Sequence, residues 1–172
     1  MGCGWARSRF SDSRDRVERN RFKVLYLGES LQVCFQEAVL KDQRDGVVGP
    51  FLIDERELAE RIYADVEIVS PLSLVDLRGS HATAMGMPTD VHRGMKHTLG
   101  QKWSAAFHEH ESKPDGIIYP SRLNGETNVA IYDRAISKLR AVRMRRLIDV
   151  DDLASVLNDL QIALYPVDCL AD

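Results

Sequence analysis

The sequence predicts a single globular domain of the α+β class that spans residues 1–172. Its length and its 44% content of apolar residues are sufficient for one substantial core. Short apolar or alternating segments indicate strands at several places, and longer segments with helical periodicity lie between them. These elements follow one another without the regular strand–helix alternation of parallel sheets, which favours the α+β class.

The first third of the chain predicts a loop, a strand and a helix, in that order. Residues 7–23 carry many charges of both signs and are expected to form a loop. The apolar run Val24–Leu27, ended by a glycine, suits a buried strand. Ser30 then offers the N-cap of a helix over Leu31–Asp42, which Gly46 closes.

The middle of the chain predicts two strands and a long helix. Residues 64–69 alternate apolar and acidic side chains, as a half-buried strand does, and Leu74–Leu77 follows as a second strand after Pro71. Thr89 or Asp90 caps the helix, whose apolar stripe consists of Val91, Met95, Leu99, Trp103, Ala106 and Phe107.

The last third predicts further strands and one helix. A turn at residues 114–116 leads into the strand Ile117–Tyr119, which Pro120 ends. Asn128–Tyr132 and Leu139–Met144 are expected to be strands as well. An acidic cap within residues 149–152 begins a final helix, whose apolar face consists of Leu153, Val156, Leu157 and Leu160.

Composition narrows the function classes and the compartment. A net charge of −3 with 28% charged residues does not favour nucleic acid or an anionic membrane as the main partner. Apolar runs such as Val47–Ile53 are interrupted by Gly and Pro and are too short to span a bilayer, and the N-terminus lacks the apolar segment of a signal peptide. Cys3, Cys34 and Cys169 are scattered and odd in number, which favours reduced thiols and a cytoplasmic location.

Glu37 holds the most unusual position among the candidate functional residues. In a helical projection of residues 31–42 it falls between two apolar arcs. If the helix is buried on nearly every side, this carboxylate is costly unless it is hydrogen-bonded or paired, which would mark a functional group. The alternative is a solvent-facing glutamate paired with Lys41 at i+4. The projection leaves both interpretations open.

Three further candidates lie beside or inside apolar segments. Tyr26 belongs to the first strand, where a tyrosine is usually a core aromatic. Arg9 belongs to the charged loop, where its neighbour Phe10 can anchor the loop to the core and hold the arginine in place. Ser121 follows a strand-ending proline, and no G-x-S-x-G elbow surrounds it, so we do not expect a hydrolase nucleophile there.

Two other polar patterns predict no site of their own. Residues 108–111, His-Glu-His-Glu, place two histidines two positions apart, which directs them to different sides of a helix, and the H-E-x-x-H spacing is absent. No metal site is therefore predicted. The basic stretch Arg140–Arg146 is expected to be an exposed strand face rather than a nucleic-acid surface.

Taken in order, these residues resemble the RES domain, a family named for its Arg, Glu and Ser. Ser8-Arg9-Phe10 is similar to the Gly-Arg-aromatic sequence near the start of family members. Tyr26 lies in a strand eleven residues before Glu37, which is also the spacing in the family. The resemblance covers about residues 7–148, and its remaining segments are Val75–Arg78, the helix that holds Trp103, Asp115–Arg122 with Ser121, and Asn128–Arg134.

The resemblance implies an ADP-ribosyltransferase-like fold and an enzyme that consumes NAD. Family members commonly split the nicotinamide–ribose bond with inorganic phosphate as acceptor, so NAD is expected as substrate and phosphate as co-substrate, without a further cofactor or a metal. Glu37 would stabilise the positive charge that develops on the ribose, Tyr26 would face the nicotinamide, and Arg9 would bind phosphate oxygens. Ser121, the fourth residue with an implied catalytic role, would orient the substrate by hydrogen bonding without attacking it. Arg122 and Asn128 are the residues expected to bind the substrate.

The resemblance also implies a partner. Family members act as toxins of toxin–antitoxin pairs, so we expect an antitoxin with an Xre-like helix-turn-helix and an oligomeric complex of the two proteins. Nucleic acid would be contacted only through the antitoxin, and no membrane is expected. Two alternative functions stay open, namely ADP-ribosyl transfer to a protein and a catalytically inactive, truncated RES domain that only binds its antitoxin.

The N-terminal segment departs from the family pattern. Ser8 replaces the usual glycine, and the segment between Arg9 and Tyr26 is longer than in shorter members. Members usually carry an extra strand region before the arginine, whereas only eight residues precede Arg9. We therefore expect a shortened N-terminus, in which Arg9 is ordered only if Phe10 and Trp5 pack on the core or if upstream sequence is restored.

Overall fold

The computed structural model describes residues 8–14 and 20–166, and these residues combine helices with strands as the α+β class requires. They fall into two compact units. The first unit comprises Met1–Glu29 and Ile68–Arg140, and the second comprises Ser30–Glu67 and Ala141–Asp172. That residues 1–172 form one domain stays a prediction. Within the described residues, no helix is both long and apolar enough to cross a membrane.

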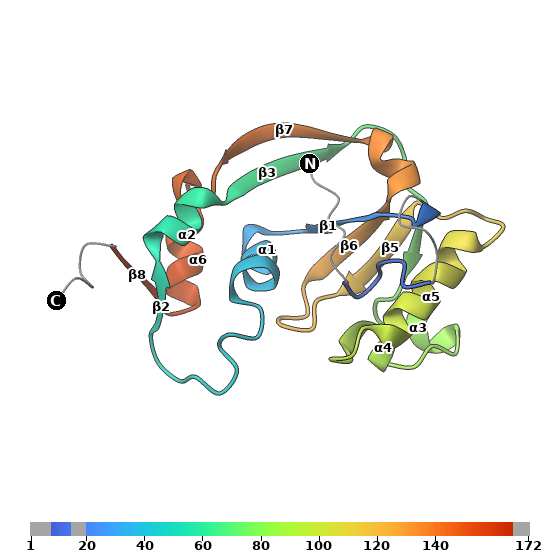
Figure 1. Cartoon of the computed structure of the whole chain (residues 1–172), viewed down its shortest axis with the longest axis horizontal. Coiled ribbons are helices and arrows are strands. Elements are labelled where there is room, and N and C mark those ends of the chain that lie inside the picture. The colour runs from blue at the N-terminus through green and yellow to red at the C-terminus, as the bar shows by residue number, and fades with distance from the viewer. Residues whose placement is uncertain (1–7, 15–19, 167–172) are drawn as a thin grey trace. The chain divides into compact units, whose positions relative to one another are not determined.

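The first unit is built on a four-stranded sheet. The order of its strands is β1 (Val24–Gly28), β6 (Thr127–Tyr132), β5 (Gly116–Pro120) and β4 (Leu74–Asp76). Strand β6 is antiparallel to β1 and β5, whereas β4 and β5 are parallel. The carboxyl ends of β1, β5 and β4 therefore meet at one edge of the sheet, where β6 begins (Figure 1).

One face of this sheet carries the core of the first unit. Side chains alternate between the two faces, so the register places Tyr26, Ala130 and Ile117 on the same face. Helix α5 (Thr98–Glu109) packs against this core, to which Trp103 contributes. The shorter elements of the unit are α3 (His81–Ala84), α4 (Asp90–Arg93) and the 3-10 helix η3 (Asp133–Lys138).

The single long helix expected after Thr89 is wrong, because the chain forms two helices there. Helix α4 ends at Gly94, whose backbone is extended, with φ −60° and ψ 146°. A Cβ atom at Gly94 would lie 2.7 Å from the carbonyl oxygen of Asp90, so this close turn suits glycine. Met95, placed in the apolar stripe by its spacing, is 76% exposed in the connection between the helices.

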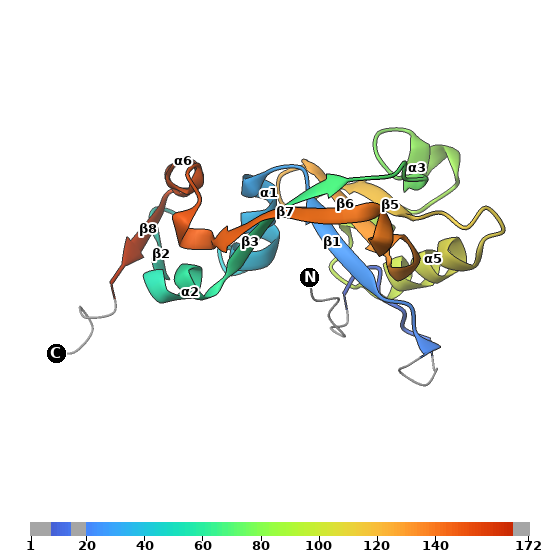
Figure 2. The same cartoon turned by 90° about the horizontal axis from the view of Figure 1, so that it is seen from above.

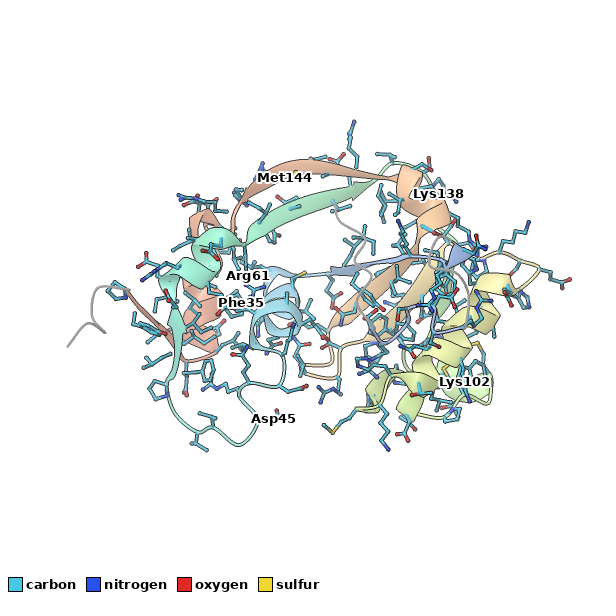
Figure 3. All side chains as sticks on the ribbon, viewed as in Figure 1. Phe35, Asp45, Arg61, Lys102, Lys138 and Met144 are labelled. Atoms are coloured by element: carbon cyan, nitrogen blue, oxygen red, sulfur yellow. The ribbon has the colours of Figure 1, made fainter. Side chains whose placement is uncertain are left out.

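The second unit surrounds a separate hydrophobic cluster that includes Phe35, Leu58 and Leu153 (Figure 3). Strands β3 and β7 run side by side as a two-stranded sheet (Figure 2), and Met144 on β7 is 63% exposed. The elements are α1 (Leu31–Phe35), the π-helix η2 (Gln36–Leu40), β2 (Phe51–Asp54), α2 (Glu55–Glu60), β3 (Ile62–Ile68), β7 (Leu139–Arg146), the 3-10 helix η4 (Leu147–Asp149), α6 (Leu153–Asp159) and β8 (Ile162–Tyr165).

The helix predicted over Leu31–Asp42 begins as expected but ends early. The Ser30 hydroxyl accepts a hydrogen bond from the Val33 N–H at 3.1 Å, which confirms the N-cap. The α-helix stops at Phe35 and continues as a wider π-helical turn. Lys41 then has a φ of 49°, which ends helical geometry. A projection at 100° per residue therefore fails after Phe35.

We expect Gly116→Ala to destabilise the protein by about 1–3 kcal/mol, the range for overpacking a close contact. A Cβ atom at Gly116 would lie 2.3 Å from the carbonyl oxygen of Ala130, a backbone atom that β5–β6 pairing holds in place. Urea unfolding measures the effect. Val142→Ala is the control, because Val142 is 46% exposed on β7 and its truncation should change stability by only about 0.5 kcal/mol. Equal unfolding midpoints for the two variants would contradict the prediction.

Candidate functional site

The loop that carries Arg9 is attached to strand β1 through Tyr26. The Tyr26 hydroxyl accepts a hydrogen bond from the Phe10 N–H at 2.8 Å and forms a second one with the Ser8 hydroxyl, also at 2.8 Å. Ser8 thus uses a side chain that the usual glycine of the family would lack. The two bonds hold the residues on both sides of Arg9, so Tyr26 determines where the loop lies on the sheet.

Phe10 anchors the same loop in the core, as its position beside Arg9 predicted. Its side chain is fully buried and contacts the Tyr119 ring edge-on, with 4.8 Å between the ring centroids. Ser11 closes the loop on itself, because its hydroxyl donates to the Ser8 carbonyl at 3.0 Å and accepts from the Ser8 N–H at 3.1 Å. The packing expected of Trp5 lies outside the described residues.

Helix α5 packs closely against the loop that carries Arg9. A Cβ atom at Gly100 would lie 2.7 Å from the Arg9 carbonyl oxygen, so only glycine allows this approach. The buried Ser104 donates its hydroxyl hydrogen to the Phe10 carbonyl at 2.7 Å. The buried Gln101 donates from Nε2 to the Ser8 carbonyl at 2.9 Å. The loop is therefore held between the sheet and the first turns of α5.

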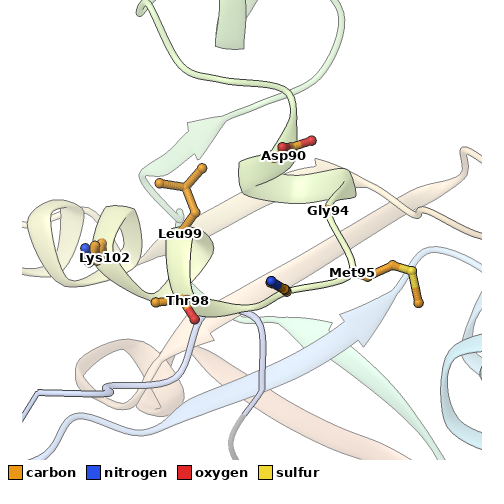
Figure 4. A pocket seen from close by; sticks show the side chains of 7 residues that line it. Asp90, Gly94, Met95, Thr98, Leu99 and Lys102 are labelled. Carbon is orange, nitrogen blue, oxygen red and sulfur yellow. The ribbon is translucent and has the colours of Figure 1, made fainter.

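The Arg9 guanidinium reaches the connection between α4 and α5. Its Nη1 donates to the Gly94 carbonyl oxygen at 2.6 Å. Gly94 also forms one wall of a surface pocket of about 450 Å³ (Figure 4). The residues that line this pocket are Asp90, Gly94, Met95, Lys96, Thr98, Leu99 and Lys102. Arg9 is thus oriented by a backbone oxygen beside an open, partly cationic hollow.

The other predicted residues of the first unit gather at the carboxyl edge of the sheet. Asn128, the second residue of β6, is 4% exposed and stands opposite Gly28 and Tyr119 in the register. Because side chains alternate along a strand, Asn128 shares its face with Tyr26. Ser121 and Arg122 follow β5 directly at this edge.

Ser121 has a structural role in the turn after β5. It is 3% exposed, its hydroxyl accepts a hydrogen bond from the Leu123 N–H at 3.1 Å, and its own N–H donates to the Glu126 carbonyl at 2.6 Å. These contacts are turn chemistry of the kind common for loop serines. They place Arg122 at a defined point of the edge.

Glu37 belongs to the second unit, where it lies on the π-helical turn and is exposed. One interpretation of the helical projection required the Glu37 side chain to be buried, and this interpretation is wrong. The alternative, a solvent-facing Glu37, is confirmed for the exposure of the side chain. The structure therefore brings Arg9, Tyr26 and Asn128 together on one face of the first unit, with Ser121 and Arg122 at its edge.

Burial sets the protonation states around the Arg9 loop. It raises the pKa of Tyr26, although the hydrogen bonds with Ser8 and Phe10 oppose the rise, so the phenol stays neutral near pH 7. Burial also lowers the pKa of His92 on α4, and the positive charges of Arg93 and Arg9 lower it further. His92 is 5% exposed, and its Nδ1 has no hydrogen-bond partner among the described residues. His92 is therefore neutral near pH 7 and adds no positive charge beside Arg9.

A second set of charges lies at the carboxyl end of β4. Arg78 donates to Asp76 from Nε at 3.0 Å and from Nη2 at 2.8 Å. These hydrogen bonds lower the pKa of Asp76 to about 2. Arg78 is thereby paired within its own turn.

The sequence analysis missed Gly100, Gln101 and Ser104, although α5 contains a signal for them. On a helix these residues span an arc of about 100°, which adjoins the apolar stripe of Leu99 and Trp103. A polar arc next to the core stripe indicates buried hydrogen bonds to another segment. The spacing does not show which segment accepts these hydrogen bonds, because the partner, the Arg9 loop, is remote in sequence.

The two histidines of the His-Glu-His-Glu segment contact neighbouring side chains. His108 stacks on Phe22 with 4.2 Å between ring centroids, and His110 Nδ1 lies 2.8 Å from the Ser112 hydroxyl. In the part of the chain that the structure describes, no three His, Cys, Asp or Glu side chains cluster as metal ligands would. The basic stretch Arg140–Arg146 forms part of β7, where most of its side chains are exposed.

Comparisons with known proteins find a family model, a curated relative and a solved structure that are similar to this chain. The family model of the RES domain matches residues 2–154. A curated protein of Sinorhizobium fredii (strain NBRC 101917 / NGR234), named "Probable toxin y4kH", is 44% identical over 126 residues, which are 73% of this chain and 99% of that protein. A chain in the crystal structure of the M. tuberculosis MbcT–MbcA toxin–antitoxin complex has a similar fold, with a TM-score of 0.56 and 18% identity over 81% of this chain and 72% of that one.

We expect Tyr26→Phe to cost about 1–3 kcal/mol of stability, because the Phe10 N–H loses its acceptor in a partly buried place. Hydrogen exchange at the Phe10 amide should accelerate along with the loss in urea unfolding. Tyr165→Phe removes the same atom from a half-buried tyrosine of β8 in the second unit, and it serves as the control. An unchanged Phe10 exchange rate in Tyr26→Phe would show that Tyr26 does not hold the loop.

Proposed function

Because the chain belongs to the RES domain family, we propose that it is the NAD-consuming toxin of a toxin–antitoxin pair. The relative named as a probable toxin and the structural neighbour from a toxin–antitoxin complex support the toxin role. The observation that carries the enzymatic part is the fixed position of Arg9, held by Tyr26, Gln101 and Gly94 at the face that Asn128 shares.

The proposed reaction is phosphorolysis of NAD. The bond between nicotinamide N1 and ribose C1′ breaks, and its electron pair leaves with nicotinamide. An oxygen of inorganic phosphate forms the new bond to C1′, which yields ADP-ribose 1″-phosphate. The ribose becomes oxocarbenium-like in the transition state, so groups that stabilise its positive charge accelerate the step. Groups that bind the NAD phosphates hold the substrate in place.

Arg9 suits the binding of the NAD phosphates. Its guanidinium is a planar set of donors that matches phosphate oxygens, and the bond to the Gly94 carbonyl uses one donor to orient the group. Since His92 is neutral near pH 7, the positive charge beside it comes from arginines such as Arg9 and Arg93 and not from the imidazole. A guanidinium that is already oriented loses less entropy on binding than a flexible one.

The remaining residues take supporting roles in this proposal. Tyr26 presents its ring on the face of the sheet below the loop, where a nicotinamide ring can pack on it. Asn128 offers an amide at the same face, and Arg122 offers a second cation at the carboxyl edge for NAD or for the acceptor phosphate. Ser121 would orient the residues of the turn after β5, since its hydroxyl accepts a hydrogen bond from the Leu123 N–H, and it would not attack the substrate.

The role of Glu37 follows from the family resemblance alone. Its carboxylate would hydrogen-bond ribose hydroxyl groups and stabilise the positive charge on the sugar. Exposure leaves the side chain accessible to a substrate, and a bound nucleotide would remove water from it, which strengthens the electrostatic effect.

The antitoxin is the proposed protein partner. It would carry an Xre-like helix-turn-helix, form an oligomeric complex with this chain in the cytoplasm and provide the only contact with DNA. Free toxin would deplete NAD, and the complex would not.

Purified protein should release nicotinamide from NAD, and the rate should rise with added phosphate. Arg9→Lys should lower kcat/KM by at least about tenfold, because a lysine cannot bind phosphate through two parallel hydrogen bonds. Arg143→Lys, an exposed change on β7, is the matched control and should keep full activity. Release of nicotinamide that ignores phosphate would replace phosphorolysis with hydrolysis or transfer to protein, and no release at all would refute the proposed activity.

Glu37→Gln should lower turnover by about 10²-fold while fold and NAD binding persist, the scale of removing one preorganised electrostatic group. Turnover of NAD under saturating conditions and circular dichroism check both parts. Glu60→Gln, at an exposed glutamate of α2, controls for the loss of a surface charge. Wild-type turnover in Glu37→Gln would remove Glu37 from the mechanism and leave it a solvated surface residue.

A further inference from the structure

Gln101 makes a contact that a plain core residue would not make. It is 7% exposed on α5, and its Nε2 lies 2.9 Å from the Ser8 carbonyl oxygen and 3.3 Å from the Ser11 hydroxyl. A carbonyl oxygen can only accept a hydrogen bond, so the amide nitrogen must face the loop. Gln101 therefore donates to the residue directly before Arg9 and to the residue two positions after it.

This contact differs from the other restraints on the loop. Ser104 holds the Phe10 carbonyl but is fully buried and also bonded to the Tyr132 hydroxyl at 3.1 Å, so it belongs to the core network. Tyr26 holds the Phe10 N–H and the Ser8 side chain. Gln101 restrains the peptide group that joins Ser8 to Arg9, the residue whose guanidinium donates to the Gly94 carbonyl.

We propose that Gln101 is a positioning residue for Arg9, an inference that rests on the proposed binding of NAD phosphates by Arg9. Without the amide donor, the Ser8 carbonyl loses its partner and the backbone at Arg9 gains freedom. The guanidinium then spends less time in the orientation that the Gly94 carbonyl gives it. Substrate binding weakens as a result, whereas the chemical step, once NAD is bound, proceeds as before.

Gln101→Met removes the donor and keeps the length of the side chain. We expect KM for NAD to rise about tenfold, which corresponds to roughly one lost hydrogen bond. We expect kcat to change by less than about twofold. Gln43→Met is the matched control, because Gln43 Nε2 also donates to a backbone carbonyl, that of Val39, at 3.4 Å in the second unit. The control should keep the wild-type KM.

The pH dependence of KM in Gln101→Glu distinguishes positioning of Arg9 from a merely structural role of Gln101. At pH 7.5 its carboxylate would face the Ser8 carbonyl oxygen and repel it, so KM should be high. Burial raises the pKa of a carboxyl group above its usual value of about 4.3, so toward pH 5 the neutral acid forms and can donate to Ser8. KM relative to wild type at the same pH should therefore fall as the pH falls, and this ratio cancels the titration of His92. Gln101→Met should show no such recovery.

Several outcomes would overturn the inference. Wild-type KM in both Gln101 variants would show that the contact is dispensable, and a loss of kcat and folded fraction at constant KM would assign Gln101 to stability alone. If the wild-type protein neither binds nor cleaves NAD, the proposed function fails separately. Hydrogen exchange at the Arg9 amide then decides: about tenfold faster exchange in Gln101→Met than in Gln43→Met supports positioning, and equal rates refute it.

Discussion

The hydrogen bonds of the Tyr26 hydroxyl are the constraint on which the candidate site depends. The Tyr26 phenol, on the core face of β1, bonds the Phe10 N–H and the Ser8 hydroxyl and so holds the loop that carries Arg9. Among the strands of the described residues, β1 pairs with β6 alone. One antiparallel register therefore sets the position of Tyr26 relative to Asn128 at the carboxyl edge. A shift of this register by one residue would turn Tyr26 to the other face and detach the loop.

The loop itself shows how a short charged segment becomes ordered. Phe10 contributes burial, and Asp12 contributes electrostatics. Burial alone would raise the pKa of Asp12, but hydrogen bonds from Arg14 and from the Phe22 N–H outweigh it and hold that pKa below its usual value. The ionised carboxylate therefore ties the end of the loop to the segment that leads into β1. Arg9 directly precedes the buried Phe10, which leaves the arginine with few backbone conformations.

The elements that the sequence predicted well are those in which local chemistry decides. The Ser30 cap, the strand before Gly28 and the strand that Pro120 ends all appear where the residue types placed them. The elements that it missed are short and depend on remote partners. Strand β2 has four residues and is stabilised by parallel pairing with β8 near the other end of the chain. The break at Gly94 escaped detection because the apolar spacing continues across it, whereas the backbone does not.

The sequence by itself determined the fold class and the family, because these follow from residue types at fixed spacings. That Arg9, Tyr26 and Asn128 act in the site stays a prediction of the family resemblance. Only the tertiary structure decided what holds Arg9, since Gln101, Ser104 and Gly94 meet the loop through hydrogen bonds between segments about 85–95 positions apart. It also decided that Glu37 is exposed, because a π-helical turn replaces the α-helical period on which its predicted burial rested. Local patterns specify which groups are available, and the geometry of packing specifies which of them meet.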